Sequence, residues 1–281
     1  MKDRPSSPAK TRLERPVAAE IVGMAPLNRD AKLITLALSD EVRLDHRPGQ
    51  FVQLSAGGVG ELPLMICSPP GSGDTFEVVA YGGDVIADAL RRNRVGDLVG
   101  IRGPFGNGYD LESLAGRDLL MVASEDGVIS LRPLLLTALA DRDKFGKLIL
   151  IQGARRPQDH LFRFDEPRLR DAGSCELLES VVEPDRHWTG EVGVVTTLLP
   201  RLDIDSHNTT AVVAGPAVMY KFVLLGLRAL GIPDDEILLA LGHHMQCGRG
   251  VCGHCRMYDT YVCKDGPIFS YTQLRGKPGV F

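Results

Sequence analysis

The chain has 281 residues, 44% of them hydrophobic, and a formal net charge of −4 at pH 7. It lacks the basic excess that nucleic-acid binding requires, and none of its apolar runs approaches the roughly 20 residues of a membrane-spanning helix. Residues 1–16 are polar and proline-rich without the apolar core of a signal peptide, so we expect a flexible arm on a cytoplasmic protein.

Residues 17–112 contain short apolar runs that end at glycine, proline or aspartate, the pattern of β-strands and turns. The runs cover residues 18–27, 32–39, 49–58, 62–70, 74–83 and 98–109. A helix is expected at residues 84–93, with Asp84 as its N-cap. This order predicts a small antiparallel β-barrel as the first domain.

From residue 113 to residue 241, strand-like runs of Leu, Ile, Val and Ala alternate with helical segments. This alternation predicts a second, α/β domain whose parallel sheet is covered by helices on both faces. Sheets of this kind bind nucleotides at the carboxyl ends of their strands. We therefore expect residues 123–125, 153–154 and 214–216 to line a crevice.

Residues 242–281 are dense in glycine and cysteine and too short for a hydrophobic core, so we expect a metal centre to stabilise them. Cys247, Cys252 and Cys255 have the C-x4-C-x2-C spacing of plant-type [2Fe-2S] centres, and Cys263 supplies a fourth thiol. Zinc ribbons use paired C-x2-C hooks, and disulfides are rare in reducing compartments. A [2Fe-2S] cluster on these four cysteines is therefore favoured over a structural zinc ion or disulfides.

Five segments of the chain read RPGQFVQL, IRGPFGNGYDL, GPAVMYKFV, MQCGRGVCGHC and YVCKDGPIFSYTQL. Together they resemble the ferredoxin–NADP reductase superfamily, in the branch with a C-terminal [2Fe-2S] cluster. That branch includes the electron-transfer subunit of dihydroorotate dehydrogenase, one of the subunits of anaerobic sulfite reductase and the gamma subunit of sulfhydrogenase-type [NiFe] hydrogenases. The resemblance implies that electrons pass between NAD(P)H, an FAD on the barrel, the cluster and a partner subunit.

The segments that would hold the flavin depart from the family pattern, which places a serine or a tyrosine–serine pair beside the ring. Met65 has no hydroxyl group, whereas Cys67 could still approach the ring. At the helix N-terminus that cradles the pyrophosphate, Ile86 replaces a hydroxyl residue and Asp84 would repel the anion. By the resemblance, the candidate flavin-binding residues are Pro63, Leu64, Met65, Ile66, Cys67, Ser68, Gly83, Val85 and Ile86.

The loop that resembles the nicotinamide site is also altered. It spans residues 124–133, where Ser124 and Glu125 replace two glycines of the family and Asp126 adds a second carboxylate. Carboxylates at this place oppose the phosphates of a dinucleotide. The sequence therefore disfavours NAD(P) in the usual mode and leaves FAD binding open.

These observations predict an electron-transfer subunit of a multi-subunit oxidoreductase of the [NiFe] hydrogenase type, which relays single electrons through its cluster. It would be active within a complex, with iron–sulfur and hydrogenase-type subunits as partners, and no catalytic side chain is assigned. Two alternatives stay open. One is a self-contained NAD(P)H-dependent reductase with FAD and a [2Fe-2S] cluster, and the other is a non-redox interaction protein with a structural zinc ion.

Overall fold

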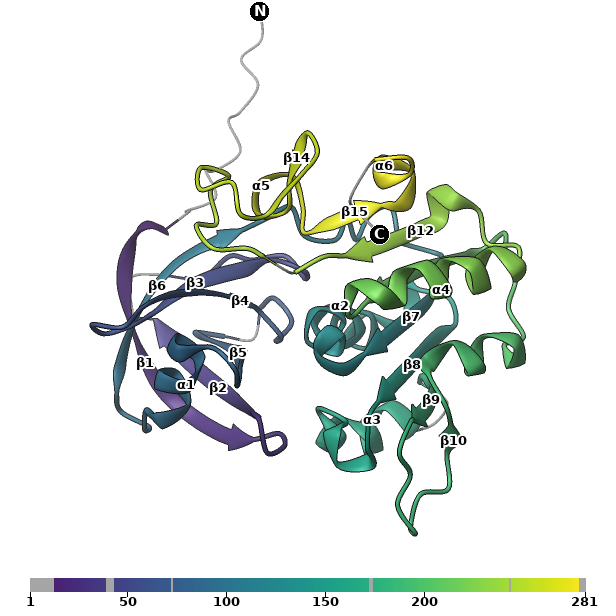
Figure 1. Ribbon diagram of the computed structural model, residues 1–281, viewed down its shortest axis with the longest axis horizontal. Coiled ribbons are helices and arrows are strands. Elements are labelled where there is room, and N and C mark those ends of the chain that lie inside the picture. The colour runs from purple at the N-terminus through teal and green to yellow at the C-terminus, as the bar shows by residue number, and fades with distance from the viewer. Residues whose placement is uncertain (1–12, 39–42, 72, 172–173, 243, 278–281) are drawn as a thin grey trace, which may run out of the picture.

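The computed structural model describes residues 13–38, 43–71, 73–171, 174–242 and 244–277. Figure 1 shows a barrel in purple and blue beside an α/β body in teal and green, with the yellow C-terminal residues lying along one side of both. Residues 1–12 of the expected arm lie outside the described residues, while residues 13–16 belong to the first strand.

The first body is an antiparallel barrel, as the short apolar runs predicted. Its strands are β1 (Leu13–Pro26), β2 (Ala31–Leu38), β3 (Phe51–Ala56), β4 (Gly60–Met65), β5 (Thr75–Tyr81) and β6 (Leu98–Phe105). They follow the order β4-β3-β6-β1-β2-β5, and a bridge between Ile66 and Val78 joins the two ends of the sheet. Helix α1 (Val85–Arg92) begins at Asp84, as predicted, and packs on β3, β4 and β5.

The second body is a mostly parallel sheet with the order β10-β9-β8-β7-β11-β12-β15. Its strands are β7 (Asp118–Ser124), β8 (Leu148–Ala154), β9 (Glu176–Val181), β10 (Glu191–Val192), β11 (Thr209–Ala214), β12 (Ile237–Ala240) and β15 (Ile268–Ser270). The α-helices are α2 (Val128–Ala140), α3 (Glu166–Arg170) and α4 (Ala217–Ala229). The 3-10 helices are η1 (Glu125–Gly127), η2 (Arg142–Lys144), η3 (Pro157–Asp159), η4 (Arg163–Asp165), η6 (Val195–Arg201) and η7 (Asp234–Glu236). Among the described residues, no helix is long and apolar enough to cross a membrane.

The C-terminal block packs on both bodies. It contains a short hairpin of β13 (Arg256–Met257) and β14 (Thr260–Tyr261), followed by α5 (Val262–Asp265), β15 and α6 (Tyr271–Leu274). Strand β15 pairs antiparallel with β12 and so extends the large sheet, which the sequence did not predict. On the barrel side, the Asn107 side chain donates to the carbonyl of Ile268 at 2.6 Å and accepts from its N–H at 3.1 Å.

Arg132 of α2 joins the barrel to the α/β body. Its guanidinium is buried, with Nε at 2.6 Å from Asp165 and Nη1 at 2.7 Å from Glu77 on β5. The same Nη1 donates to the backbone oxygen of Cys67 at 2.9 Å, and the ring of Phe162 stacks on the guanidinium. Arg132 belongs to the loop that resembles the nicotinamide site, and here its contacts are those of interdomain packing.

Candidate metal centre and nucleotide seats

The four cysteines of the C-terminal block come together as two pairs. The thiol of Cys247 interacts with that of Cys252, and the thiol of Cys263 interacts first with that of Cys255 and then with the charge of Cys247. The N–H of Cys263 lies 3.5 Å from the Cys255 sulfur. Nowhere in the described part of the chain do three potential ligand side chains surround one point, as they would around a single ion. A zinc ion needs its donors around one centre, whereas a two-iron cluster takes two thiolates on each iron. The pairing of these residues therefore fits a [2Fe-2S] cluster.

Backbone N–H groups point at the sulfurs. The N–H of Arg249 lies 3.4 Å from the Cys247 sulfur, and that of Gly250 lies 3.1 Å from the Cys263 sulfur. Gly250 has a φ of 72°, in the left-handed region where glycine is favoured, so the loop can turn its N–H groups inward. Hydrogen bonds of this kind stabilise thiolate charge on a metal ligand.

The two ends of the cysteine set differ in their ionisation. Burial acts to raise the pKa of Cys247, but the N–H groups of Arg249, Cys252 and Val251 together with the Cys252 thiol lower it to about 6. Burial, followed by the neighbouring Cys255 thiol, raises the pKa of Cys263 to about 12. Of these two cysteines, Cys247 is thus the one whose thiol ionises at neutral pH.

The cysteine loop also has an outer and an inner side. Cys255 and Cys263 are buried in the core, whereas Cys252 is exposed. Val251 beside it is 78% exposed, an unusual place for a branched apolar side chain. A redox partner can therefore approach the metal site from the Cys252 side.

A cavity of about 560 Å³ lies between the barrel and the α/β body. Pro63, Leu64 and Met65 line its barrel wall, while residues 66–68 are buried and lie outside the lining. Burial raises the pKa of the Cys67 thiol to about 12, so this group is neutral and packed in the core. Of the six residues proposed to flank the flavin ring, the structure thus brings three to the cavity.

The cavity carries negative charge. Asp84 and Asp126 line it, and no lysine or arginine is found among the described residues of its wall. Burial, and then the charges of Asp126, Asp30 and Asp159, raise the pKa of Tyr81, which also lines the cavity. These negative charges would repel the phosphate groups of a ligand.

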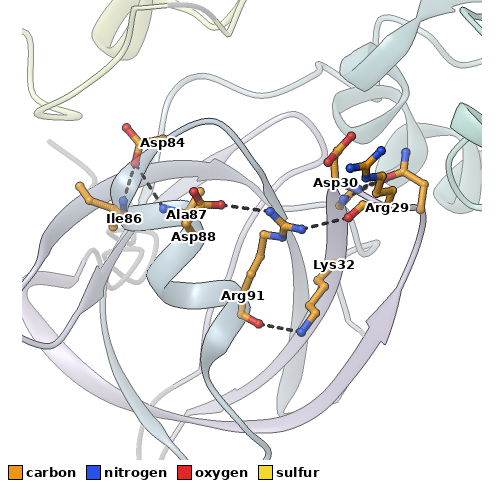
Figure 2. A network of polar contacts seen from close by, with 10 residues as sticks. Arg29, Asp30, Lys32, Asp84, Ile86, Ala87, Asp88 and Arg91 are labelled. Carbon is orange, nitrogen blue, oxygen red and sulfur yellow. Dashed lines mark hydrogen bonds and ion pairs between the residues drawn. The ribbon is translucent and has the colours of Figure 1, made fainter.

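Asp84 occupies the N-terminus of α1, the seat where a flavin pyrophosphate would bind. Its Oδ1 accepts hydrogen bonds from the N–H groups of Ile86 at 2.7 Å and Ala87 at 3.2 Å, as Figure 2 shows. These are the N–H groups that a helix start otherwise offers to an anion. A carboxylate of the chain itself fills the seat, so the residues present do not fit the pyrophosphate of FAD.

The other residues at the start of α1 do not restore a site for a phosphate group. Gly83 precedes Asp84 with a φ of 108°, Val85 is 73% exposed, and the Ile86 side chain packs on the barrel core. Arg91 of the same helix is held by Asp88 and by the carbonyl of Arg29, both at 3.0 Å (Figure 2). The nearby cation is therefore engaged in an internal network.

The crevice loop of the α/β body combines a tight turn with acidic side chains. A Cβ at Gly127 would clash with the carbonyl of Ala214, so this position requires glycine. Glu125 has a φ of 55°, a left-handed conformation that favours glycine, and yet it carries a carboxylate. Burial raises the pKa of Asp126 in the same turn. Two acidic side chains at the start of α2 do not fit the pyrophosphate of NAD(P) in its usual position.

The strand ends named from the sequence line cavities, except for Ala123, which is buried. Residues 214–216 contribute to the cavity between the bodies, and residues 153–154 to a second one of about 650 Å³. Glu125 lines the second cavity, where Val195 and Phe222 form apolar parts of the wall. The crevice of the α/β fold is therefore present, although its phosphate-binding loop is acidic.

Two polar residues of the barrel lie under the cysteine loop and were missed in the sequence. Gln53 of β3 is buried and donates from Nε2 to the carbonyl of Gln246. Arg102 of β6 is the cross-strand partner of Gln53 and forms an ion pair with Glu61 of β4. Single polar side chains inside the apolar runs FVQLS and GIRGP are the signal that could have indicated them.

Two family models match the chain. Residues 243–275 match the iron–sulfur cluster binding domain of dihydroorotate dehydrogenase B, and they include all four cysteines of the loop. Residues 121–224 match an oxidoreductase NAD-binding domain, which includes the acidic crevice loop.

Curated relatives match over most of their length. Sulfhydrogenase 1 subunit gamma of Pyrococcus furiosus is 35% identical over 241 residues, which cover 83% of this chain and 82% of the relative. Sulfhydrogenase 2 subunit gamma of the same organism is 33% identical, with 90% and 94% covered. A probable dihydroorotate dehydrogenase B (NAD(+)), electron transfer subunit, of Methanocella arvoryzae is 33% identical, with 95% of each chain covered.

Solved structures share the fold. The structure of an NADH-dependent reduced ferredoxin-NADP oxidoreductase superposes with a TM-score of 0.72 at 24% identity, covering 90% of this chain and 88% of that one. The ferredoxin reductase in carbazole 1,9a-dioxygenase superposes with a TM-score of 0.67 at 21% identity, covering 80% and 68%. At these identities the likeness shows the arrangement of the bodies.

Proposed function

The chain belongs to the ferredoxin–NADP reductase superfamily, in the branch of the sulfhydrogenase gamma and dihydroorotate dehydrogenase electron-transfer subunits, and we propose that it relays single electrons through a [2Fe-2S] cluster. It would do so in the cytoplasm as one subunit of a larger oxidoreductase. None of the six cysteines, all of which lie in the described residues, forms a disulfide, as is usual in a reducing compartment.

The observation that carries this proposal is the two-by-two arrangement of Cys247 with Cys252 and of Cys255 with Cys263. A [2Fe-2S] cluster, when bound, accepts and releases one electron at a time. The four thiols would hold it, and the N–H groups of Arg249 and Gly250 would stabilise the charge on its sulfur ligands. The exposed Cys252 side would face the partner that exchanges electrons.

We propose further that the subunit works without FAD and without NAD(P) in their usual positions. Asp84 fills the flavin pyrophosphate seat, and Glu125 and Asp126 occupy the corresponding turn of the α/β body. The barrel and the α/β body would then serve as the framework that presents the cluster. This version differs from the flavin-dependent electron path that the family resemblance implied.

A hydrogenase-type complex is the assembly we propose for this subunit. The two relatives at 35% and 33% identity are gamma subunits of sulfhydrogenases, and they match over 82% and 94% of their length. The partners would then be iron–sulfur and hydrogenase-type subunits. A dihydroorotate dehydrogenase B-type assembly is the second candidate, because one relative with that name is covered over 95% of its length.

A cofactor count tests the proposal. The full chain is purified without oxygen, and iron, acid-labile sulfide and acid-released flavin are measured per chain. Two irons with two sulfides and no flavin would support the single-cluster relay. Two irons with one FAD per chain would instead restore the flavin-dependent path that the family resemblance implied, and bleaching of that flavin by NAD(P)H would favour a self-contained reductase. Zinc without iron would favour a structural metal and overturn the proposal.

A further inference from the structure

We propose that the barrel sets the reduction potential of the cluster through the ion pair of Arg102 and Glu61. This inference rests on the function proposed above, because it concerns the cluster that Cys247 would help to hold. Neither residue belongs to the cysteine loop. Arg102 lies on β6 and Glu61 on β4, both in the barrel.

Gln53 identifies the barrel face that meets the cysteine loop. Its Nε2 donates to the carbonyl of Gln246, and a Cβ added at Gly248 would lie 3.1 Å from the same nitrogen. Gln53 and Arg102 are direct partners in the antiparallel pair of β3 and β6. Directly opposed residues project to the same face of a sheet, so Arg102 lies on the face that the loop covers.

The ion pair is partly exposed to water, and Arg102 is its more buried member. Arg102 Nε lies 3.1 Å from Glu61 Oε1, and the side chains are 13% and 34% exposed. The hydrogen bond to Glu61 raises the pKa of Arg102 against the effect of burial, with further contributions from the charges of Glu61 and Cys247. An arginine keeps its charge in proteins, and the strand register places Arg102 beside Gln53, which bonds to the chain neighbour of Cys247.

The two members of the pair act on the metal site with opposite signs. One-electron reduction makes the site more negative by one charge, so a nearby cation favours the reduced state and a nearby anion favours the oxidised state. Glu61 is the more exposed member, and water weakens its effect more than that of Arg102. The pair would thus raise the potential above the value that the cysteine loop alone would give.

The test is a redox titration of the full chain, followed by electron paramagnetic resonance, with iron content measured in each variant. Arg102→Gln should raise the ratio of oxidised to reduced cluster at a fixed ambient potential about tenfold, which is about 59 mV for a one-electron couple. Glu61→Gln should shift the ratio less and in the opposite direction. The double variant should return toward the wild type, and Arg102→Lys, which keeps the charge, should remain near it.

Arg117→Gln is the matched control. Arg117 forms a comparable ion pair with Glu236 at 2.9 Å, with side chains 23% and 33% exposed. Both residues precede strands of the large sheet, whereas the cysteine loop follows the carboxyl end of β12. This variant should leave the potential unchanged.

The outcomes separate this inference from the proposed function. Absence of iron from the purified wild-type protein would overturn the proposed function itself. Intact clusters with unchanged potentials in both single variants, or shifts of the same sign, would overturn the role of the pair. A merely structural role would lower the iron content of both single variants without opposite shifts. If the Arg102→Gln variant did not hold the cluster, two other variants would still test the inference. Glu61→Gln should raise the reduction potential, and Arg102→Lys should leave it near the wild-type value.

Discussion

The cysteine loop and the start of α1 both present backbone N–H groups to negative charge, but the charge has a different origin in each. In the loop, the N–H groups of Arg249 and Gly250 point at sulfurs that can bind metal. At α1, the N–H groups of Ile86 and Ala87 are taken by the carboxylate of Asp84. One site is left ready for a ligand and the other is closed by the chain itself. The family resemblance puts a flavin pyrophosphate at the second site, and we propose that the carboxylate of Asp84 excludes it.

The start of α2 in the α/β body resembles the start of α1, because carboxylates of the chain lie where a nucleotide would approach. Gly127 still allows the close approach of α2 to β11, which the fold needs. The residues that would meet a nucleotide are acidic, as Glu125 and Asp126 are. Under our proposal, packing is kept where nucleotide binding is lost, so changes in the two regions should have different consequences.

The largest effect should come from a change in the cysteine loop. Cys252→Ser removes a thiolate ligand, and we expect near-complete loss of iron and of the electron paramagnetic resonance signal of the reduced protein, with both larger bodies still folded. Cys175→Ser is the control, because burial raises the pKa of that thiol to about 12 and it lies in a different core. An unchanged spectrum in Cys252→Ser would show that our ligand set is wrong.

The next effect concerns Arg132, a residue of the nucleotide loop that now holds the two bodies together. Arg132→Met leaves Glu77 and Asp165 without their cation, and we expect a loss of about 3 kcal/mol in the free energy of unfolding by urea. Arg155→Met is the control: its ion pair with Glu183 is on the surface and should contribute less than about 1 kcal/mol. Equal losses in the two variants would contradict a special packing role for Arg132.

The third effect is a dependence of the free energy of unfolding on pH, which arises from a buried histidine of the α/β body. Burial, aided by the charge of Arg163, lowers the pKa of His160 from 6.5 to about 4. The unfolded chain takes up a proton below about pH 6.5, whereas the folded chain does so near pH 4, so stability should be complete above pH 6.5 and fall as the pH is lowered to 4. The expected loss is about 2–3 kcal/mol at pH 4.

Urea unfolding at pH 7 and pH 4.5 measures this loss. His160→Phe keeps a ring to stack on Trp188 and has nothing to protonate, so the variant should lose less stability than the wild type. Parallel losses in the two proteins would assign the pH dependence to other groups.

The smallest effect is the most direct test of the closed seat. Asp84→Gly frees the N–H groups of Ile86 and Ala87, and we expect FAD to bind about tenfold more tightly than to the wild type, by fluorescence titration. Loss of the Asp84 side chain as N-cap should lower the stability of the helix by a few tenths of a kcal/mol. Asp84→Asn, which removes the charge and keeps a capping oxygen, should give a smaller gain.

Asp88→Asn is the matched control, because it removes the same charge from the same helix without opening the N–H groups. It should bind FAD no better than the wild type. Tight FAD binding by the wild type would show that Asp84 moves aside and that the seat is open.

Several features were predictable because they depend on short stretches of chain. Continuous apolar runs indicated the buried strands β7 and β11, and Asp84 before an amphipathic segment indicated the start of α1. Strand β15 was missed, because three residues carry too little pattern and their pairing depends on β12 being next to them. Cys67 was considered for the flavin ring, whereas its N–H pairs with Glu77 and its side chain is buried.

Periodicity, caps and cysteine spacing are local properties, and they were sufficient for most strands of the barrel and of the α/β body and for the four candidate ligands. The surroundings of those ligands required the folded chain. Arg102, Glu61 and Cys247 are far apart in sequence. The register of β3, β4 and β6 brings Arg102 and Glu61 to one face of the barrel, and the bond from Gln53 to Gln246 holds the cysteine loop against that face. The electrostatics of the metal site depend on such distances between remote charges, and no local pattern of residues encodes them.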